Sequence, residues 1–262
     1  MPFSRPYHAL ASLVALAFAA VPPALAPSVA TADGASEVAV STPVRLEAAE
    51  REAAVMLFRP RSAPIGLVMI AHGFSRSADR HGELARSLAQ AGFLVAVPDL
   101  PYFSNHAANG VALRDLAHAL ARLAPDAPAD LPIVLVGFSA GGLASLLSAR
   151  EIVGLSGWIG LDPVDLRGQG AAAAASLGVP SLVLRAPPSG CNANGNGAGI
   201  AAALPGSLAA DVVFAGASHC DFEDPTSLAC VVACGADDAE RREVIRRAVV
   251  SAALEMVHAA RH

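Results

Sequence analysis

The segment from Ile133 to Gly142 reads Ile-Val-Leu-Val-Gly-Phe-Ser-Ala-Gly-Gly, an apolar run that passes directly into a Gly-x-Ser-x-Gly turn centred on Ser139. Such a run predicts a buried strand, and the small residues after it predict a tight turn into a helix. A serine exposed at this turn needs a strained backbone, so Gly137 and Gly141 stand where a Cβ would collide with the neighbouring strand and helix. The segment therefore predicts a serine presented as a nucleophile. The Gly-x-Ser-x-Gly pattern also occurs by chance, so the alternative interpretation is an ordinary glycine-rich turn between a strand and a helix.

Strands and helices are expected to alternate along the chain. β-type runs are expected at about 38–46, 53–58, 65–71, 93–97, 132–137, 158–161, 180–185 and 211–215, and helices at 77–91, 110–123, 140–150 and 239–260. This alternation predicts an α/β fold with a mostly parallel, twisted sheet and helices on both faces. No repeat or linker divides residues 33–262, which we expect to form one catalytic domain.

The composition limits which partners the protein can bind, and the N-terminal segment indicates its cellular location. The net charge is −5 at pH 7, which provides no basic surface for a nucleic acid. Residues 1–32 have a basic start, a short apolar core and a run of small residues, the pattern of a cleaved signal peptide. That core is too short for a comfortable membrane span. We expect a secreted or periplasmic monomer whose mature chain has no integral membrane segment.

All four cysteines lie in the last third of the chain. In an oxidising compartment an even number of cysteines indicates two disulfides. Cys191 and Cys220 could be joined, or Cys220 could pair with Cys230 and Cys191 with Cys234. A zinc site that includes His219 is the competing hypothesis, but the sequence lacks a paired C-x-x-C. The spacing favours disulfides without deciding their connectivity.

A serine hydroxyl becomes a good nucleophile when a base takes its proton and a carboxylate orients that base. His219 follows the last expected strand and is the expected base. Asp162 is the expected acid, because the chain leaves a strand there, before a proline. Asp165 is the substitute. Asp221 and Asp224 suit the role of the acid less well, because they share a loop with the histidine. For Asp162 and Asp165 the alternative role is that of a turn residue or helix cap.

An oxyanion that forms at the attacked carbonyl needs preorganised donors. The N–H of Ala140 follows the nucleophile at the start of a helix, and the N–H of Phe74 lies in a His-Gly-Phe-Ser loop after the strand at 65–71. These two groups are the expected oxyanion donors. The substrate is expected to contact the side chains of Phe74, Phe138, Pro163 and Val164. Chemistry of this kind uses no metal and no cofactor.

Four segments together resemble the α/β-hydrolase superfamily. His72-Gly-Phe, Gly137-Phe-Ser-Ala-Gly-Gly, Leu161-Asp-Pro-Val-Asp and Ser218-His-Cys-Asp-Phe-Glu-Asp look like segments of chlorophyllases, platelet-activating-factor acetylhydrolases and related bacterial polyester hydrolases. The resemblance implies an α/β-hydrolase fold whose acid stands one strand early, as in chlorophyllases and acetylhydrolases. Cutinase-like polyester hydrolases place the acid after the next strand, where this chain has Cys191-Asn.

This resemblance implies a serine carboxylic ester hydrolase that acts through an acyl-enzyme. Only about 18 residues separate Asp162 from Pro180, too few for a cap domain, so the substrate is expected to be an accessible small-molecule or polymeric ester. Polyester, cutinase-like or lipase activity is an alternative, as is acyl transfer from the same acyl-enzyme. A non-catalytic binding module is disfavoured by the complete, ordered triad.

Overall fold

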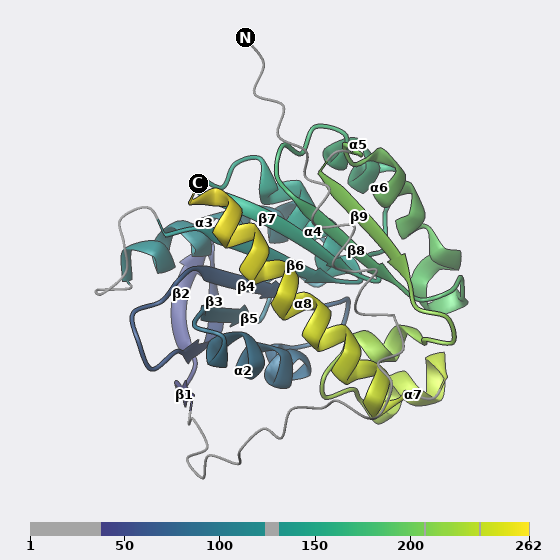
Figure 1. Ribbon diagram of the computed structural model, residues 1–262, viewed down its shortest axis with the longest axis horizontal. Helices are drawn as coiled ribbons and strands as arrows, with labels where there is room; N and C mark the ends of the chain where they lie inside the picture. Colours follow the sequence, from purple (N-terminus) through teal and green to yellow (C-terminus); the bar gives the residue numbers. More distant parts are fainter. Residues whose placement is uncertain (1–37, 124–130, 207, 236, 262) are drawn as a thin grey trace, which may run out of the picture.

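The computed structural model describes residues 38–123, 131–206, 208–235 and 237–261. Within these ranges one sheet of nine strands runs in the order β1-β3-β5-β4-β6-β7-β8-β9, with β2 paired to β3 (Figure 1). The strands are β1 (Ala39–Val40), β2 (Val44–Ala48), β3 (Arg51–Arg59), β4 (Leu67–Ala71), β5 (Leu94–Pro98), β6 (Ile133–Phe138), β7 (Leu155–Leu161), β8 (Ser181–Arg185) and β9 (Ala209–Val213). β1 and β2 each pair antiparallel with β3, and β3 pairs antiparallel with β5. From β5 through β4, β6, β7 and β8 to β9, all neighbouring strands are parallel.

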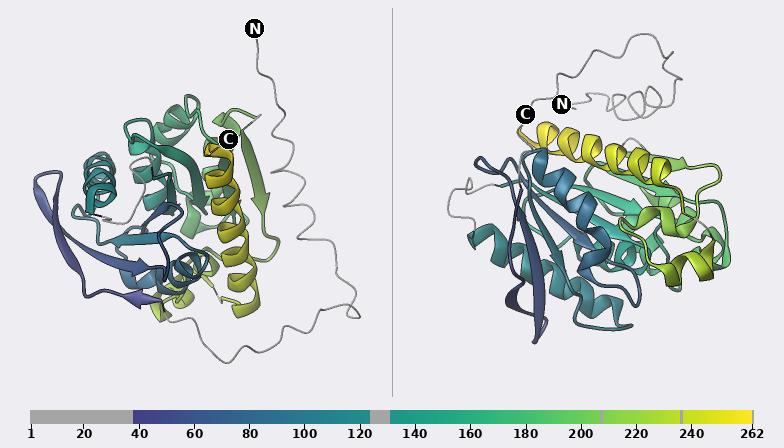
Figure 2. Two further views of the ribbon diagram at one scale, coloured as in Figure 1. Left: turned by 60° about the vertical axis from the view of Figure 1, so that its left-hand side comes forward. Right: turned by 90° about the horizontal axis from the view of Figure 1, so that it is seen from below.

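Helices cover both faces of the sheet, which confirms the expected α/β class. Figure 2 shows α8 and α2 along one face and α3 on the other. The helical segments are η1 (Ala78–His81), α2 (Gly82–Gln90), α3 (His106–Leu123), α4 (Ala140–Ala149), α5 (Gln169–Ala174), η2 (Gly190–Gly195), α6 (Gly197–Ala203), η3 (His219–Phe222), α7 (Leu228–Cys234) and α8 (Ala239–Ala260). Residues 163–180, all of them described, contain only α5 between β7 and β8, so no cap domain interrupts the sheet there.

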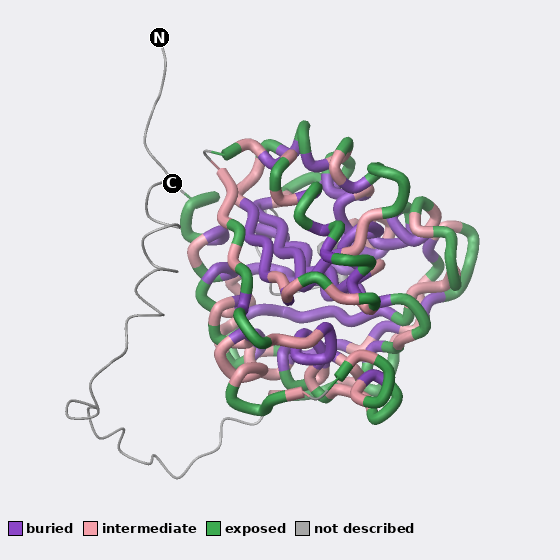
Figure 3. Tube along the Cα trace, turned by 90° about the vertical axis from the view of Figure 1, so that its right-hand side faces the viewer, coloured by how far each residue is buried: buried purple, intermediate pink, exposed green. Residues whose placement is uncertain are grey.

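The central strands are apolar at every position because both of their faces are buried (Figure 3). Successive side chains of a strand point to opposite faces. Thus Leu67 and Met69 of β4 join the core that includes Leu116 of α3, whereas Val68 and Ile70 join the core under α2 and α8. A continuous apolar run is what a parallel strand between two helical layers requires.

Most expected elements are present in the structure, with differences in their bounds. The run expected at 38–46 is divided into β1 and β2, which both pair with β3. The helix expected at 77–91 is divided into η1 and α2, and α3 begins at His106, earlier than the expected residue 110. The predicted signal peptide at 1–32 lies outside the described residues. Within the part of the chain that the structure describes, no helix combines the length and apolar character needed to cross a membrane.

Two disulfides connect the loops at one end of the sheet to α7. Cys191 pairs with Cys234 and Cys220 with Cys230, the second of the two arrangements left open by the spacing. Cys230 and Cys234 are four residues apart on α7, so their side chains lie on one face of that helix. α7 is therefore bonded both to η2 and to η3.

Reduction of these disulfides is expected to lower the melting temperature substantially. The longer disulfide closes a loop with a sequence separation of 43 residues. In the chain-entropy account such a loop stabilises the folded state by about 4 kcal/mol. For a domain of this size the Tm should fall by roughly 8–16 °C. Thermal denaturation with and without dithiothreitol measures the effect.

A variant with all four cysteines replaced by serine is the control for that experiment. Its Tm should already be low and should not respond to dithiothreitol. An unchanged Tm of the native protein on reduction would contradict a structural role for the disulfides.

Candidate active site

Ser139 lies at the junction of β6 and α4, in a backbone conformation that non-glycine residues rarely adopt. It has φ 53° and ψ −121° and is the N-cap of α4. A Cβ added to Gly137 would come within 3.0 Å of Gly141, and one added to Gly141 would come within 3.0 Å of the carbonyl oxygens of Ala71 and His72. Since real Cβ atoms do not tolerate such contacts, the turn needs glycine at both positions. The collision inferred from the sequence is present in the structure.

Asp162 and His219 are joined by a hydrogen bond between the carboxylate and the imidazole ring. His219 Nδ1 donates to Asp162 Oδ2 at 2.6 Å. Both side chains are buried. Because the carboxylate accepts at Nδ1, the lone pair of Nε2 is left to accept a proton from a hydroxyl. The pair has the arrangement of a base and the acid that orients it.

The topology brings Ser139 to this pair. β6 and β7 are parallel neighbours, with Phe138 opposite Leu161, so Ser139 and Asp162 follow adjacent strand ends. The N–H of Ser139 donates to the Leu161 carbonyl at 3.0 Å. The ring of Phe138 lies 4.6 Å from that of His219, measured between centroids. All three residues of the predicted triad therefore gather at the carboxyl end of the sheet, where α/β sheets place their ligand sites.

Asp162 is held from its other side as well. The Ala186 N–H donates to Oδ1 at 3.0 Å, and the Asn192 amide nitrogen lies 3.3 Å from Oδ1 and 3.2 Å from Oδ2. Asp162 itself has φ 40°, a left-handed conformation that is uncommon for a residue with a Cβ. The carboxylate is thus fixed by three donors, two from the loop after β8 and one from the loop of His219.

The other candidate acids make different contacts. Asp165 accepts hydrogen bonds from the N–H groups of Gly170 and Ala171 at 2.7 and 3.1 Å, in the first turn of α5, whose N-cap residue is Gly168. Asp221 accepts from the Ser218 N–H and pairs with Arg241 of α8. Asp224 pairs with arginines of α8. Of the four aspartates considered from the sequence, Asp162 is the one that meets the histidine.

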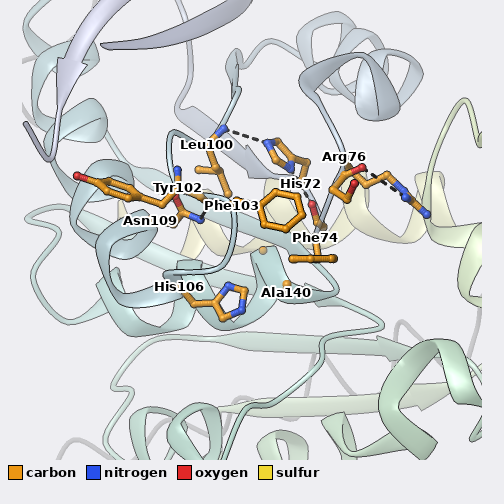
Figure 4. A pocket seen from close by; sticks show the side chains of 12 residues that line it. His72, Phe74, Arg76, Leu100, Tyr102, Phe103, His106, Asn109 and Ala140 are labelled. Atoms are coloured by element: carbon orange, nitrogen blue, oxygen red, sulfur yellow. Dashed lines mark hydrogen bonds between the residues drawn. The ribbon is translucent and has the colours of Figure 1, made fainter. Parts of the chain in front are cut away.

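A small cavity of about 70 Å³ lies beside the nucleophile turn. Phe74 and Ala140, the two predicted oxyanion donors, both line it (Figure 4). The N–H of Ala140 opens α4, where the first four N–H groups of a helix have no partner within the helix. The rings of Phe74 and Phe103 lie 4.5 Å apart, measured between centroids. The cavity therefore combines two candidate donors with an aromatic wall.

His72 holds the loop that carries Phe74. Its Nδ1 donates to the Gly73 carbonyl at 2.8 Å, and its Nε2 accepts from the Leu100 N–H at 2.9 Å. Burial lowers the pKa of His72. A neutral ring with both nitrogens engaged in this way cannot act as a base for Ser139, so its role is to fix the loop.

An ion pair between a partly exposed arginine and a buried glutamate joins this loop to the loop of the histidine. Arg76 Nε donates to Glu223 Oε1, and the Glu223 side chain is 0% exposed. Thr226 donates a second hydrogen bond to this carboxylate at 3.4 Å. No motif in the sequence marked this pair, because its members are 147 residues apart. The two loops are thereby held together across the site.

The residues expected to contact substrate differ in exposure. Phe74 is 49% exposed, and Val164 is partly exposed. Phe138 and Pro163 are buried, and Phe138 packs under His219. The structure thus leaves Phe74 and Val164 accessible at the surface of the site.

Comparison with known proteins supports this description of the fold. The family model described as "Hydrolase_4: Serine aminopeptidase, S33" matches residues 62–172, which include Ser139 and Asp162. The structure of dienelactone hydrolase from Anabaena variabilis ATCC 29413 superimposes with a TM-score of 0.66 at 17% sequence identity. The match covers 83% of this chain and 98% of the dienelactone hydrolase chain. Est1E from Butyrivibrio proteoclasticus gives 0.64 at 15% identity, covering 83% of this chain and 100% of its own. A search of curated proteins found no significant match.

The fold is that of the α/β-hydrolases. The expected architecture is therefore confirmed, including the mostly parallel twisted sheet and the helices on both faces. Because fold alone does not determine activity, the function has to be argued from the site.

Proposed function

We propose that the protein is a serine carboxylic ester hydrolase that works through an acyl-enzyme. The observation that carries this proposal is the hydrogen bond from His219 Nδ1 to Asp162 Oδ2, located at the same end of the sheet as the strained Ser139 turn. A strained serine at the same end of the sheet as an imidazole with an oriented, buried carboxylate matches the arrangement that activates a hydroxyl. The match to a hydrolase family model over the segment with Ser139 also supports it.

In the proposed reaction Ser139 Oγ attacks the ester carbonyl while His219 Nε2 takes its proton. The N–H groups of Ala140 and Phe74 then stabilise the oxyanion. When the tetrahedral intermediate collapses, His219 gives the proton to the departing alcohol. A water molecule, deprotonated by the same imidazole, hydrolyses the acyl-enzyme and restores Ser139. Asp162 stays ionised throughout and stabilises the imidazolium.

The cavity beside the turn suits the acyl group of the substrate. The departing alcohol must lie close to His219 to receive its proton, whereas the cavity is lined by the loops around Phe74 and Phe103 and by Ala140. A volume of about 70 Å³ accommodates a short acyl chain. Without a cap between β7 and β8, the alcohol part can extend into solvent, which suits accessible small or polymeric esters. The position of the acid after β7 supports the resemblance to chlorophyllases and acetylhydrolases.

Amide hydrolysis is the second candidate, because the matching family model is described as a serine aminopeptidase. An aminopeptidase has to bind a positively charged amino group close to the scissile bond. Of the described residues that line the cavity, none carries a carboxylate, and Arg76 is among them. The lack of a carboxylate in this lining disfavours a substrate with a free amino group at the scissile bond. Acyl transfer to an acceptor other than water uses the same acyl-enzyme and requires only a different second step.

Rates on paired ester and anilide substrates test this proposal. The purified protein is expected to hydrolyse p-nitrophenyl acetate and butyrate with a far higher kcat/KM than amino-acid p-nitroanilides, measured by release of the coloured product. Faster cleavage of an anilide would favour the peptidase alternative. No release from any ester would contradict the proposed function.

We further propose that the protein is exported. The pattern of residues 1–32 and the pairing of all four cysteines support a secreted or periplasmic location. Fractionation of cells that produce the full chain, with N-terminal sequencing of the exported form, tests it; cleavage is expected after Ala30 or Ala32. Retention of the intact chain in the cytoplasm would contradict the proposal.

A further inference from the structure

We infer that Asn192 is a positioning residue for the triad, one that orients the Asp162 carboxylate with an amide group. The inference rests on the proposed ester hydrolysis. Asn192 lies in η2, within the loop that follows β8, and its side chain is 0% exposed. From there its amide nitrogen lies 3.3 and 3.2 Å from the two oxygens of Asp162.

The surroundings of Asn192 determine which way its amide points. Its Oδ1 accepts hydrogen bonds from the backbone N–H groups of Ser189 and Gly195 at 2.8 and 2.9 Å. Because a backbone N–H can only donate, the oxygen must face these two groups. The amide nitrogen must therefore face Asp162, and it also donates to the Pro187 carbonyl at 3.0 Å. All the hydrogen-bonding groups of this side chain have partners.

This orientation makes asparagine specifically suited to the position. A buried carboxylate is stable only when its oxygens are hydrogen-bonded or paired. Asp162 already has the Ala186 N–H and the His219 ring, and Asn192 supplies the remaining donor. The donor carries no charge, so it does not compete with His219 for the carboxylate. It fixes the plane of the carboxylate and, through it, the ring of the base.

A disulfide anchors the segment that carries this amide. Cys191, the preceding residue, is bonded to Cys234 of α7, and α7 is bonded through Cys230 to Cys220, the residue after His219. The residue that orients the acid and the residue that acts as base are thus both next to a cysteine bonded to the same short helix. This arrangement restrains the distance between them.

The variant Asn192→Asp is the most informative test, because it changes two donors into acceptors with almost no change in shape. The introduced carboxyl can still accept from the N–H groups of Ser189 and Gly195, so these two hydrogen bonds of the loop are kept. When ionised, however, it directs an oxygen towards Asp162 and the Pro187 carbonyl. Two adjacent buried carboxylates cannot both ionise easily, so the pair retains a proton until higher pH.

We expect kcat of Asn192→Asp on p-nitrophenyl butyrate to fall about 100-fold relative to wild type at pH 9, with KM unchanged, because the acid and base lose their alignment. The ratio of variant to wild-type kcat should rise as the pH decreases to 6, where a protonated carboxyl can donate to Asp162 as the amide does. The matched control is Asn194→Asp in the same loop, which adds the same charge at an exposed position and should leave the ratio near one at every pH.

Equal kcat of Asn192→Asp and wild type over the whole pH range would overturn the inference, while leaving ester hydrolysis by the wild type intact. A loss of kcat that is identical at all pH values would also overturn the inference, because the effect of a merely structural defect does not depend on the protonation of the introduced carboxyl. If Asn192→Asp does not fold, Asn192→Ala serves as the second variant. It should lower kcat about tenfold without a change in KM, and full activity of Asn192→Ala would contradict the positioning role. Absence of esterase activity in the wild type would instead contradict the proposed function.

Discussion

Replacing Ser139 with alanine is expected to lower kcat for p-nitrophenyl butyrate by about 10⁵- to 10⁶-fold. In the proposed mechanism the alanine variant lacks the atom that forms the acyl-enzyme, and the remaining residues can only bind the substrate and stabilise its oxyanion. Stability should change little, because alanine differs from serine only by the hydroxyl. Initial rates at saturating substrate, corrected for spontaneous hydrolysis, measure the effect.

Ser148→Ala provides a matched control on the same helix. Ser148 is also buried, but its hydroxyl donates to the Ser145 carbonyl within α4. Its loss should leave kcat unchanged. If Ser139→Ala retained wild-type kcat, or if Ser148→Ala lost as much, Ser139 would not be the nucleophile.

Replacing Asp162 with asparagine is expected to lower kcat by about 10⁴-fold with a small effect on KM. An amide at this position can present an N–H to His219, which would place the ring proton on Nε2. In that tautomer the imidazole cannot accept the proton of Ser139. The imidazolium formed during attack would also lose its counter-charge in a buried environment. Steady-state kinetics on the same ester, with circular dichroism to verify folding, measures both consequences.

Asp165→Asn is the control variant that distinguishes the catalytic role proposed for Asp162 from the role of the neighbouring Asp165. Each carboxylate oxygen of Asp165 accepts one N–H group in the first turn of α5, from Gly170 or Ala171. Asparagine keeps only one of these two acceptors, so its introduction should lower the free energy of unfolding by about 1 kcal/mol and leave kcat unchanged. The opposite pattern, with near-normal turnover in Asp162→Asn and loss of turnover in Asp165→Asn, would transfer the role of acid to Asp165.

Much of this fold could be predicted because its signals are local. The strand before Ser139 is a continuous apolar run, and the glycines around the turn are required by backbone atoms a few residues away. Most strand ends in the structure lie within a few residues of the ends expected from the sequence. The short helices α6 and α7 were not expected, because seven residues cannot show a clear helical periodicity. Their presence depends on packing and, for α7, on two disulfides.

The candidate site was predictable where its members follow strand ends. Ser139, Asp162 and His219 each stand directly after a strand or in the loop beyond it, so the parallel topology brings them to one end of the sheet. Asp165 could not be excluded from sequence, because both aspartates precede the same helix. The distinction depends on their contacts: Asp162 accepts from His219, whereas Asp165 accepts from the N–H groups of Gly170 and Ala171.

Partners from distant segments could not be predicted. Asn192 occupies a loop in which the sequence showed only the absence of a carboxylate, and its role depends on the direction of its amide. Glu223 and Arg76 are separated by 147 residues, and nothing in either segment indicates the other. The cysteine pairing was equally open, because it depends on which loops α7 contacts.

The most direct test of the account is to identify the residue that carries the acyl group during turnover. The protein is mixed rapidly with p-nitrophenyl butyrate, quenched with acid and digested, and the peptides are analysed by mass spectrometry. We expect a butyryl group on Ser139, less of it in Asp162→Asn because acylation is slowed, and none in Ser139→Ala. A butyryl group on another residue of the active enzyme, or turnover by Ser139→Ala at the wild-type rate, would contradict the account.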